Sequence, residues 1–89
     1  MKRGLTFPNP SRSYDQKGRG VRFWGYDTTI EVSFFIEEEA LAKIHSAMSR
    51  DEAGFLNAFD LNCERIRKVA GNVYSLRRRA LYALTATDF

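Results

Sequence analysis

The sequence predicts a small α+β domain spanning residues 1–89, with its elements in the order β-β-β-α-α-β. We expect a mainly antiparallel sheet with two helices packed on one face. Two patterns indicate this class. Apolar and polar residues alternate over 29–36, as in a strand with one buried face. Apolar residues then recur every three or four positions over 50–75, as along one side of a helix. A chain of 89 residues has room for a single core.

Three strands are expected before the first helix. A short extended segment at 3–7 ends at the stiff, proline-containing stretch Pro8–Pro10. A β-hairpin follows, with runs at 20–25 and 29–36 on either side of a turn at 25–28. One face of this hairpin is expected to be buried, and it carries Val21, Phe23, Ile30, Val32, Phe34 and Ile36.

Two helices are expected after the hairpin. The first opens at Glu37–Glu39, whose carboxylates favour the positive end of the helix dipole. Ser49 and Glu52 match a capping box, which predicts the start of a long helix over 50–75. A last strand at 80–85 closes the chain. The apolar arc of the first helix comprises Ala40, Leu41, Ile44, Ala47 and Met48, and the stripe of the second comprises Phe55, Phe59, Cys63, Ile66, Ala70 and Val73.

Composition limits the classes of protein that the chain can represent. Cys63 is the single cysteine, so neither a disulfide nor a cysteine-rich zinc site can form within one chain. The basic N-terminus is not followed by the apolar stretch of a signal peptide, and no run has the length of a membrane span. We therefore expect a cytoplasmic protein. The formal net charge of +3 is mildly basic, far from that of a basic nucleic-acid-binding arm.

Several short segments resemble a bacterial family, the domain of unknown function DUF1488. They are Leu5–Asn9, Ser13–Asp15, Gly20–Asp27, the acidic stretch before Ala40 and Leu41, and Leu84–Phe89. The resemblance runs nearly end to end. It implies a compact, cytoplasmic α+β domain from a bacterium, without an assigned activity. None of the segments is a known catalytic signature, so the resemblance supplies no site residues.

The chain lacks the residue combinations of common active sites. His45 is the single histidine and lies just off the apolar arc of the first helix, as a boundary residue does. Cys63 falls inside the long apolar stripe, which favours a small buried side chain over a reactive thiolate. The adjacent carboxylates of Glu37–Glu39 fan out around the helix axis and do not converge. We therefore expect no catalytic residue, no metal site and no cofactor. An enzyme would require a pocket that holds His45 beside a carboxylate.

The outward side of the hairpin carries the clearest indication of a binding surface. Arg22 and Trp24 are expected to point outward from the first run, and Phe35 interrupts the polar side of the second. Tyr82 is a third candidate for an outward aromatic. Exposed aromatic residues are typical of surfaces that bind another protein. The leading hypothesis is a non-catalytic interaction or regulatory module that binds an unidentified protein partner or self-associates as a homodimer.

Basic charge is concentrated toward the two ends of the chain. The formal charge is +4 over residues 1–27, −6 over 28–64 and +5 over 65–89. If the first and last strands are neighbours, these ends form a patch suited to phosphate that comprises Arg19, Arg22, Arg77, Arg78 and Arg79. The alternative hypothesis is therefore a nucleic-acid-binding protein. In the competing interpretation, Arg78 and Arg79 are solvated charges beside the last strand.

Overall fold

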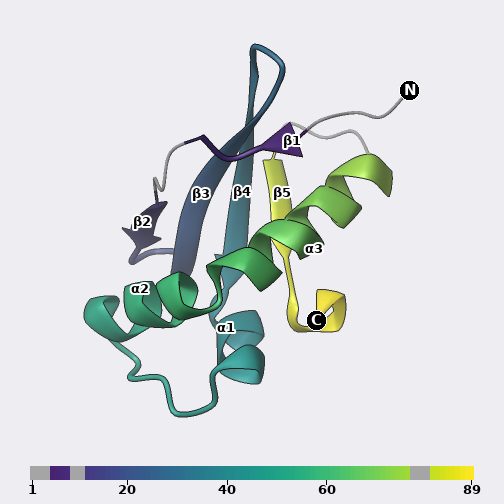
Figure 1. Cartoon of the computed structure of the whole chain (residues 1–89). Coiled ribbons are helices and arrows are strands. Elements are labelled where there is room, and N and C mark those ends of the chain that lie inside the picture. Colours follow the sequence, from purple (N-terminus) through teal and green to yellow (C-terminus); the bar gives the residue numbers. More distant parts are fainter. Residues whose placement is uncertain (1–4, 9–11, 77–80) are drawn as a thin grey trace.

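A mixed β-sheet forms one layer of the molecule, and helices form the other (Figure 1). The computed structural model describes residues 5–8, 12–76 and 81–89. The predicted α+β class is confirmed, with five strands and three α-helices among the described residues. In chain order the elements are β1 (Leu5–Thr6), β2 (Arg12–Asp15), β3 (Gly20–Asp27), β4 (Ile30–Glu37), α1 (Glu38–Ile44), α2 (Glu52–Leu61), α3 (Cys63–Leu76), β5 (Leu81–Leu84) and the 3-10 turn η1 (Ala86–Asp88).

The antiparallel hairpin of β3 and β4 is the centre of the sheet, whose strand order is β1-β3-β4-β5. β1 and β2 both pair antiparallel with β3, at opposite ends of that strand. β5 pairs with β4 and runs parallel to it. Parallel neighbours need a crossover, which the helical segment between β4 and β5 provides. The expectation of a mainly antiparallel sheet is thus correct, with β5 as the parallel exception.

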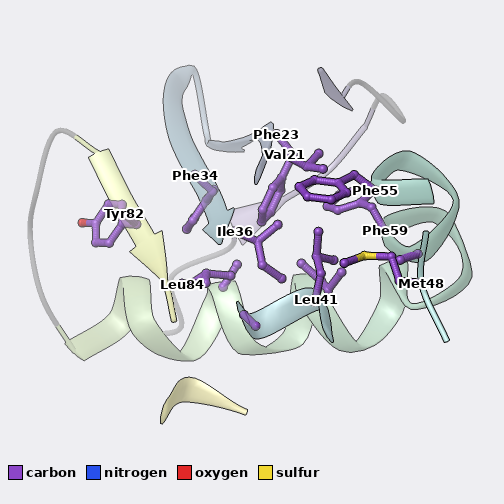
Figure 2. Close-up of a cluster of buried hydrophobic side chains, with 14 of the residues drawn as sticks. Val21, Phe23, Phe34, Ile36, Leu41, Met48, Phe55, Phe59, Tyr82 and Leu84 are labelled. Carbon is purple, nitrogen blue, oxygen red and sulfur yellow. The ribbon is translucent and has the colours of Figure 1, made fainter. Parts of the chain in front are cut away.

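The hydrophobic core lies between the sheet and the helices (Figure 2). The rings of Phe23 and Phe34 stack with their centroids 5.2 Å apart, and the ring of Phe59 lies 5.1 Å from that of Phe23. Each fully buried apolar side chain of this size stabilises the fold by roughly 1.5–3 kcal/mol. The sheet contributes Val21, Phe23, Val32, Phe34, Ile36, Tyr82 and Leu84, and the helical segment contributes Ala40, Leu41, Met48, Phe55, Ala58, Phe59, Ile66 and Ala70.

The hairpin departs from the prediction at its turn. β3 continues through the predicted turn to Asp27, which pairs with Ile30, so the chain reverses at Thr28 and Thr29. Thr28 adopts a φ of 58°, a left-handed conformation that is strained for a β-branched residue. Ile30 was expected to be buried and is 63% exposed. The prediction is wrong there because the hairpin tip extends beyond the helix layer (Figure 1).

The expected long helix is two helices. α2 ends and α3 begins on either side of Asn62, whose backbone N–H bonds to the carbonyl oxygens of Ala58 and Phe59, both at 3.2 Å. The Asn62 side-chain amide also donates to Ala58 O, at 2.9 Å. Because a single residue leaves the helix, the apolar stripe keeps its phase, and its members are buried or half-buried on both sides of the break.

The start of α2 also differs from the expectation. Asp51, rather than Ser49, is the N-cap, and its carboxylate accepts a hydrogen bond of 2.8 Å from Gly54 N. α1 ends at Ile44, because His45 leaves the helical conformation with a φ of −148°. Ala47, expected on the apolar arc, is exposed, whereas Met48 reaches the core from the loop.

β2 is an element that the sequence did not indicate. Its four residues lack the apolar alternation of a strand, and tertiary contacts hold it in place. The Tyr14 ring meets Phe55 edge-on with a centroid distance of 5.2 Å. The Arg12 guanidinium donates two hydrogen bonds, of 2.9 and 2.8 Å, to the carboxylate of Asp60 in α2. These contacts attach the sheet edge to the helix layer.

Candidate interaction surface

The side of the sheet turned away from the helices is the candidate site. None of the described helices or strands covers it, as the exposed or half-buried state of its side chains shows. Its residues follow from strand register, in which Arg22 pairs with Phe35 and Trp24 with Ser33. We call this side the outer face, and its side chains are those of Thr6, Ser13, Asp15, Arg22, Trp24, Tyr26, Glu31, Ser33, Phe35, Glu37, Leu81 and Ala83.

Leu81 is the most exposed of the large apolar side chains on the outer face, at 45%. β5 places it beside Ser33, which lies next to Trp24, so one row crosses the sheet as Trp24, Ser33 and Leu81. Phe35 and Ala83 lie in the neighbouring row. Sequence reasoning missed Leu81 and favoured Tyr82, which is only 1% exposed and points into the core. The sequence could have shown that Leu81 and Tyr82 face opposite sides of β5, because neighbouring strand residues alternate. Which of the two faces outward depends on how β5 pairs with β4.

Phe35 has a structural partner within its own chain. A Cβ on Gly20 would lie 2.5 Å from Phe35 Cζ, and one on Gly18 would lie 3.0 Å from the same atom. The ring therefore lies over a surface made by two glycines, and this packing accounts for its half-burial. Phe35 was expected to be an outward side chain that contacts a binding partner. The structure shows that it also covers the backbone of the β2–β3 turn and the start of β3.

The two described arginines of the predicted basic patch, Arg19 and Arg22, form ion pairs with nearby carboxylates. Arg22 Nε donates to Asp15 Oδ2 at 3.0 Å. The backbone N–H of Gly18, and secondarily Arg22, lower the pKa of the Asp15 carboxyl. Arg19, the other described member of the patch, pairs with Glu38 at 2.9 Å. Arg77, Arg78 and Arg79 lie outside the described residues. Moreover β3 and β4 separate β1 from β5, so the first and last strands are not neighbours.

Glu38 forms the most connected ion pair among the described residues. It accepts hydrogen bonds from Arg19 in the β2–β3 turn and from Arg50 in the loop before α2. The hydrogen bond from Arg19, followed by that from Arg50, lowers the pKa of Glu38 to about 2. The three adjacent glutamates differ in their partners: Glu37 is the N-cap of α1, Glu38 bridges the two arginines, and Glu39 is exposed. Beside them lies a depression of about 220 Å³ that Gly18, Arg19 and Phe35 also line.

The family model that matches the chain, over residues 5–85, is described as "Protein of unknown function (DUF1488)". The chain belongs to this family. The match confirms the resemblance seen in the sequence. No curated protein and no solved structure matches the chain. Membership in DUF1488 assigns no residue a role, so the function must be argued from the surface itself.

The remaining candidate residues of this DUF1488 chain lie in the helix layer. His45 ends α1 and is half-buried. Cys63 begins α3 and is half-buried: it packs against the core but also lines a depression of about 440 Å³ with polar neighbours such as Asp60 and Arg65. In the described ranges, no three His, Cys, Asp or Glu side chains are grouped as metal ligands. No helix of the described part has the length and apolar character needed to cross a membrane.

Proposed function

We propose that this DUF1488 chain is a non-catalytic interaction or regulatory module of the bacterial cytoplasm that acts through its outer face and self-associates as a homodimer. The observation that carries the proposal is the row of Trp24, Ser33 and Leu81, with Leu81 45% exposed on a face that no described element covers. The helices cover the opposite face of the same sheet, whose apolar side chains are buried in the core.

The chemistry of the outer face supports a protein partner. Phe, Tyr, Trp and Arg are enriched in protein interfaces, and here Trp24, Phe35, Tyr26 and Arg22 lie on adjacent rows. An open β-sheet surface that carries Trp24, Phe35 and Leu81 offers area for packing rather than an enclosed cavity for a small molecule. Trp24 and Phe35 are half-buried and Leu81 is exposed, and apolar surface left open to solvent in this way is typical of interaction sites on soluble proteins.

The test compares the wild type with Leu81→Lys and with a matched control, Leu61→Lys. Both variants exchange an exposed leucine for a charge, but Leu61, 66% exposed, ends α2 in the helix layer. Tagged chains are cross-linked in cells that produce the protein naturally and purified, and both their protein and nucleic acid are analysed. We expect a protein partner, a second copy included, with the wild type and Leu61→Lys and its loss with Leu81→Lys. Equal recovery with all three chains would overturn the proposal.

The same purification tests the nucleic-acid hypothesis. Nucleic acid that is retained at low salt, released as salt rises and unaffected by Leu81→Lys would support it over a protein-binding outer face. Two arginines of the predicted patch, Arg19 and Arg22, already neutralise carboxylates, which reduces the charge available to phosphate. This pairing is the reason that we rank nucleic acid second.

A further inference from the structure

Each end of the outer face carries a carboxylate beside an aromatic ring. At the hairpin end, Glu31 pairs with Tyr26 on β3, so the two side chains are neighbours on the same side of the sheet. At the α1 end, Glu37 follows Phe35 two positions along β4 and therefore lies on that side as well. The two glutamates are six residues apart on one strand, which corresponds to about 20 Å.

These two carboxylates are not neutralised by the described part of the chain. No hydrogen bond or ion pair joins the Glu31 or the Glu37 side chain to another described residue. Arg22 and Asp15, on the same face, pair with each other at 3.0 Å, so their charges cancel. The described side chains of the outer face therefore carry net negative charge, although the formal net charge of the chain is +3.

The α1 end also has room for a bound side chain. Phe35 and Glu37 both line the depression of about 220 Å³ beside the start of α1. Arg19 lines it as well, but its guanidinium is held by Glu38 at 2.9 Å. Lysine and arginine side chains have an apolar stem and a charged end, so one of them can pack on a ring while its charge meets a carboxylate. A free carboxylate beside an aromatic ring is thus suited to a cationic side chain.

We propose that the outer face binds a basic protein partner, which places two cationic side chains about 20 Å apart on either side of an apolar patch. This inference rests on the proposed function and names the chemistry of the partner. One cationic side chain meets Glu31 and Tyr26, and the other meets Glu37 and Phe35. The apolar patch packs on the row that crosses the sheet between them. Complementary charge of this kind accelerates association and selects the partner.

A second copy of the chain is less favoured on the same face. Both ends of the face are acidic, so like charges meet across a two-fold interface whichever way the strands of the two copies run. Self-association through this face should therefore strengthen as salt screens the repulsion, whereas binding of a basic partner should weaken. The two occupants compete, so the basic partner is expected to dissociate the homodimer.

The test uses two short peptides as probes and follows the NMR amide resonances of the folded chain. The basic peptide is Lys-Thr-Leu-Thr-Leu-Thr-Lys, whose lysines and leucines share one side when it is extended, with the lysines spaced as the two glutamates are. The acidic peptide has glutamate in place of both lysines. We expect only the basic peptide to shift resonances of β3 and β4, with its Kd rising at least about threefold between about 50 and about 300 mM salt.

Two double variants distinguish the outer face from negative charge elsewhere. One combines Glu31→Gln with Glu37→Gln. The matched control combines Glu52→Gln with Glu64→Gln, which removes two exposed carboxylates of α2 and α3 and changes the net charge equally. We expect the first to weaken binding of the basic peptide about tenfold and the control to weaken it less than about twofold. Dispersed amide spectra check that both variants are folded, and equal weakening by the two would overturn the proposal.

The remaining outcomes separate this inference from the proposed function. Binding of neither peptide, or equal binding of both, overturns the basic partner, while loss of a cross-linked protein with Leu81→Lys would still support the outer face. Shifts of β3 and β4 that depend on the concentration of the chain alone, strengthen with salt and persist when the basic peptide is added would identify a second copy as the occupant instead. If cross-linking is also insensitive to Leu81→Lys, both proposals fail.

Discussion

Glu38 accepts hydrogen bonds from Arg19 and Arg50, which are 19 and 12 positions away in the sequence. It therefore joins the β2–β3 turn, the first turn of α1 and the loop before α2. Only the charged carboxylate accepts from both guanidinium groups, so the pairing is coupled to protonation.

This coupling predicts a pH dependence of stability. The pKa of Glu38 falls from 4.5 to about 2 on folding, so the folded state favours the charged form. The stabilisation is present above pH 4.5 and is lost as the pH falls toward 2. We expect Glu38→Gln to unfold at a lower temperature than the wild type at neutral pH, with a difference that shrinks on acidification through this window. Thermal unfolding at several pH values measures it. A difference that is independent of pH, or one equalled by the exposed neighbour in Glu39→Gln, would contradict the assignment.

Replacing glycine by alanine should have opposite effects on the free energy of unfolding at Gly20 and at Gly71. A Cβ on Gly20 would lie 2.3 Å from the carbonyl oxygen of Ile36 on the paired strand, so backbone would have to move. We expect Gly20→Ala to cost about 1–3 kcal/mol of unfolding free energy. Gly71 lies within α3, and a Cβ there would meet no described neighbour within 4 Å, so Gly71→Ala should add about 0.5–1 kcal/mol. Urea denaturation of both variants checks the pair, and equal signs would contradict it.

At the scale of elements, the ends of the helices depend on single polar residues. Asp51 caps α2 through Gly54 N, and Asn62 separates α2 from α3 with its backbone and side-chain amides. The tight approach of Ser49 to α2 fixes the loop: its carbonyl oxygen lies 2.1 Å from the position that a Cβ on Gly54 would occupy. Glycine at this position of the first turn is what permits the close contact.

Asp51 as the N-cap of α2 and Ser49 as the N-cap lead to different predictions for the stability of alanine variants. Asp51→Ala should lower the free energy of unfolding by about 0.5–2 kcal/mol, because Gly54 N loses its acceptor. Ser49→Ala serves as the matched control and should change it by less than about 0.5 kcal/mol. Urea denaturation of the two variants decides between the residues, and a larger loss for Ser49→Ala would restore the sequence-based cap.

At the scale of the whole molecule, the two faces of the sheet differ in burial. The inner face carries the core, with Leu84 fully buried, and the outer face carries Leu81 at 45% exposure, although both belong to β5. Stability is therefore expected to depend on one face and association on the other.

Alanine substitutions within β5 test this separation. Leu84→Ala leaves a cavity in the core and should cost about 2–5 kcal/mol of unfolding free energy. Leu81→Ala should change the stability of the monomer by no more than about 0.5 kcal/mol, while weakening self-association. Urea denaturation at low protein concentration and sedimentation at high concentration measure the two effects. A severe loss of monomer stability in Leu81→Ala would show that the outer face is part of the core.

The local patterns of the sequence were sufficient for the fold class, the central hairpin and the apolar stripe through α2 and α3. Alternation in β4 and the three-to-four spacing from Phe55 to Val73 depend only on neighbouring residues, and burial of one side follows from them. The outward positions of Arg22, Trp24 and Phe35 follow from the same alternation, and the family resemblance likewise rests on short local segments.

Tertiary contacts alone determined the rest. β2 exists because Tyr14 and Arg12 meet α2, and the exposure of Leu81 follows from the parallel register of β5 on β4. The strand order places β3 and β4 between β1 and β5, which no local pattern of the sequence indicated. Each of these features depends on residues far apart in the chain, whose distances are set by packing rather than by any periodicity that the sequence displays.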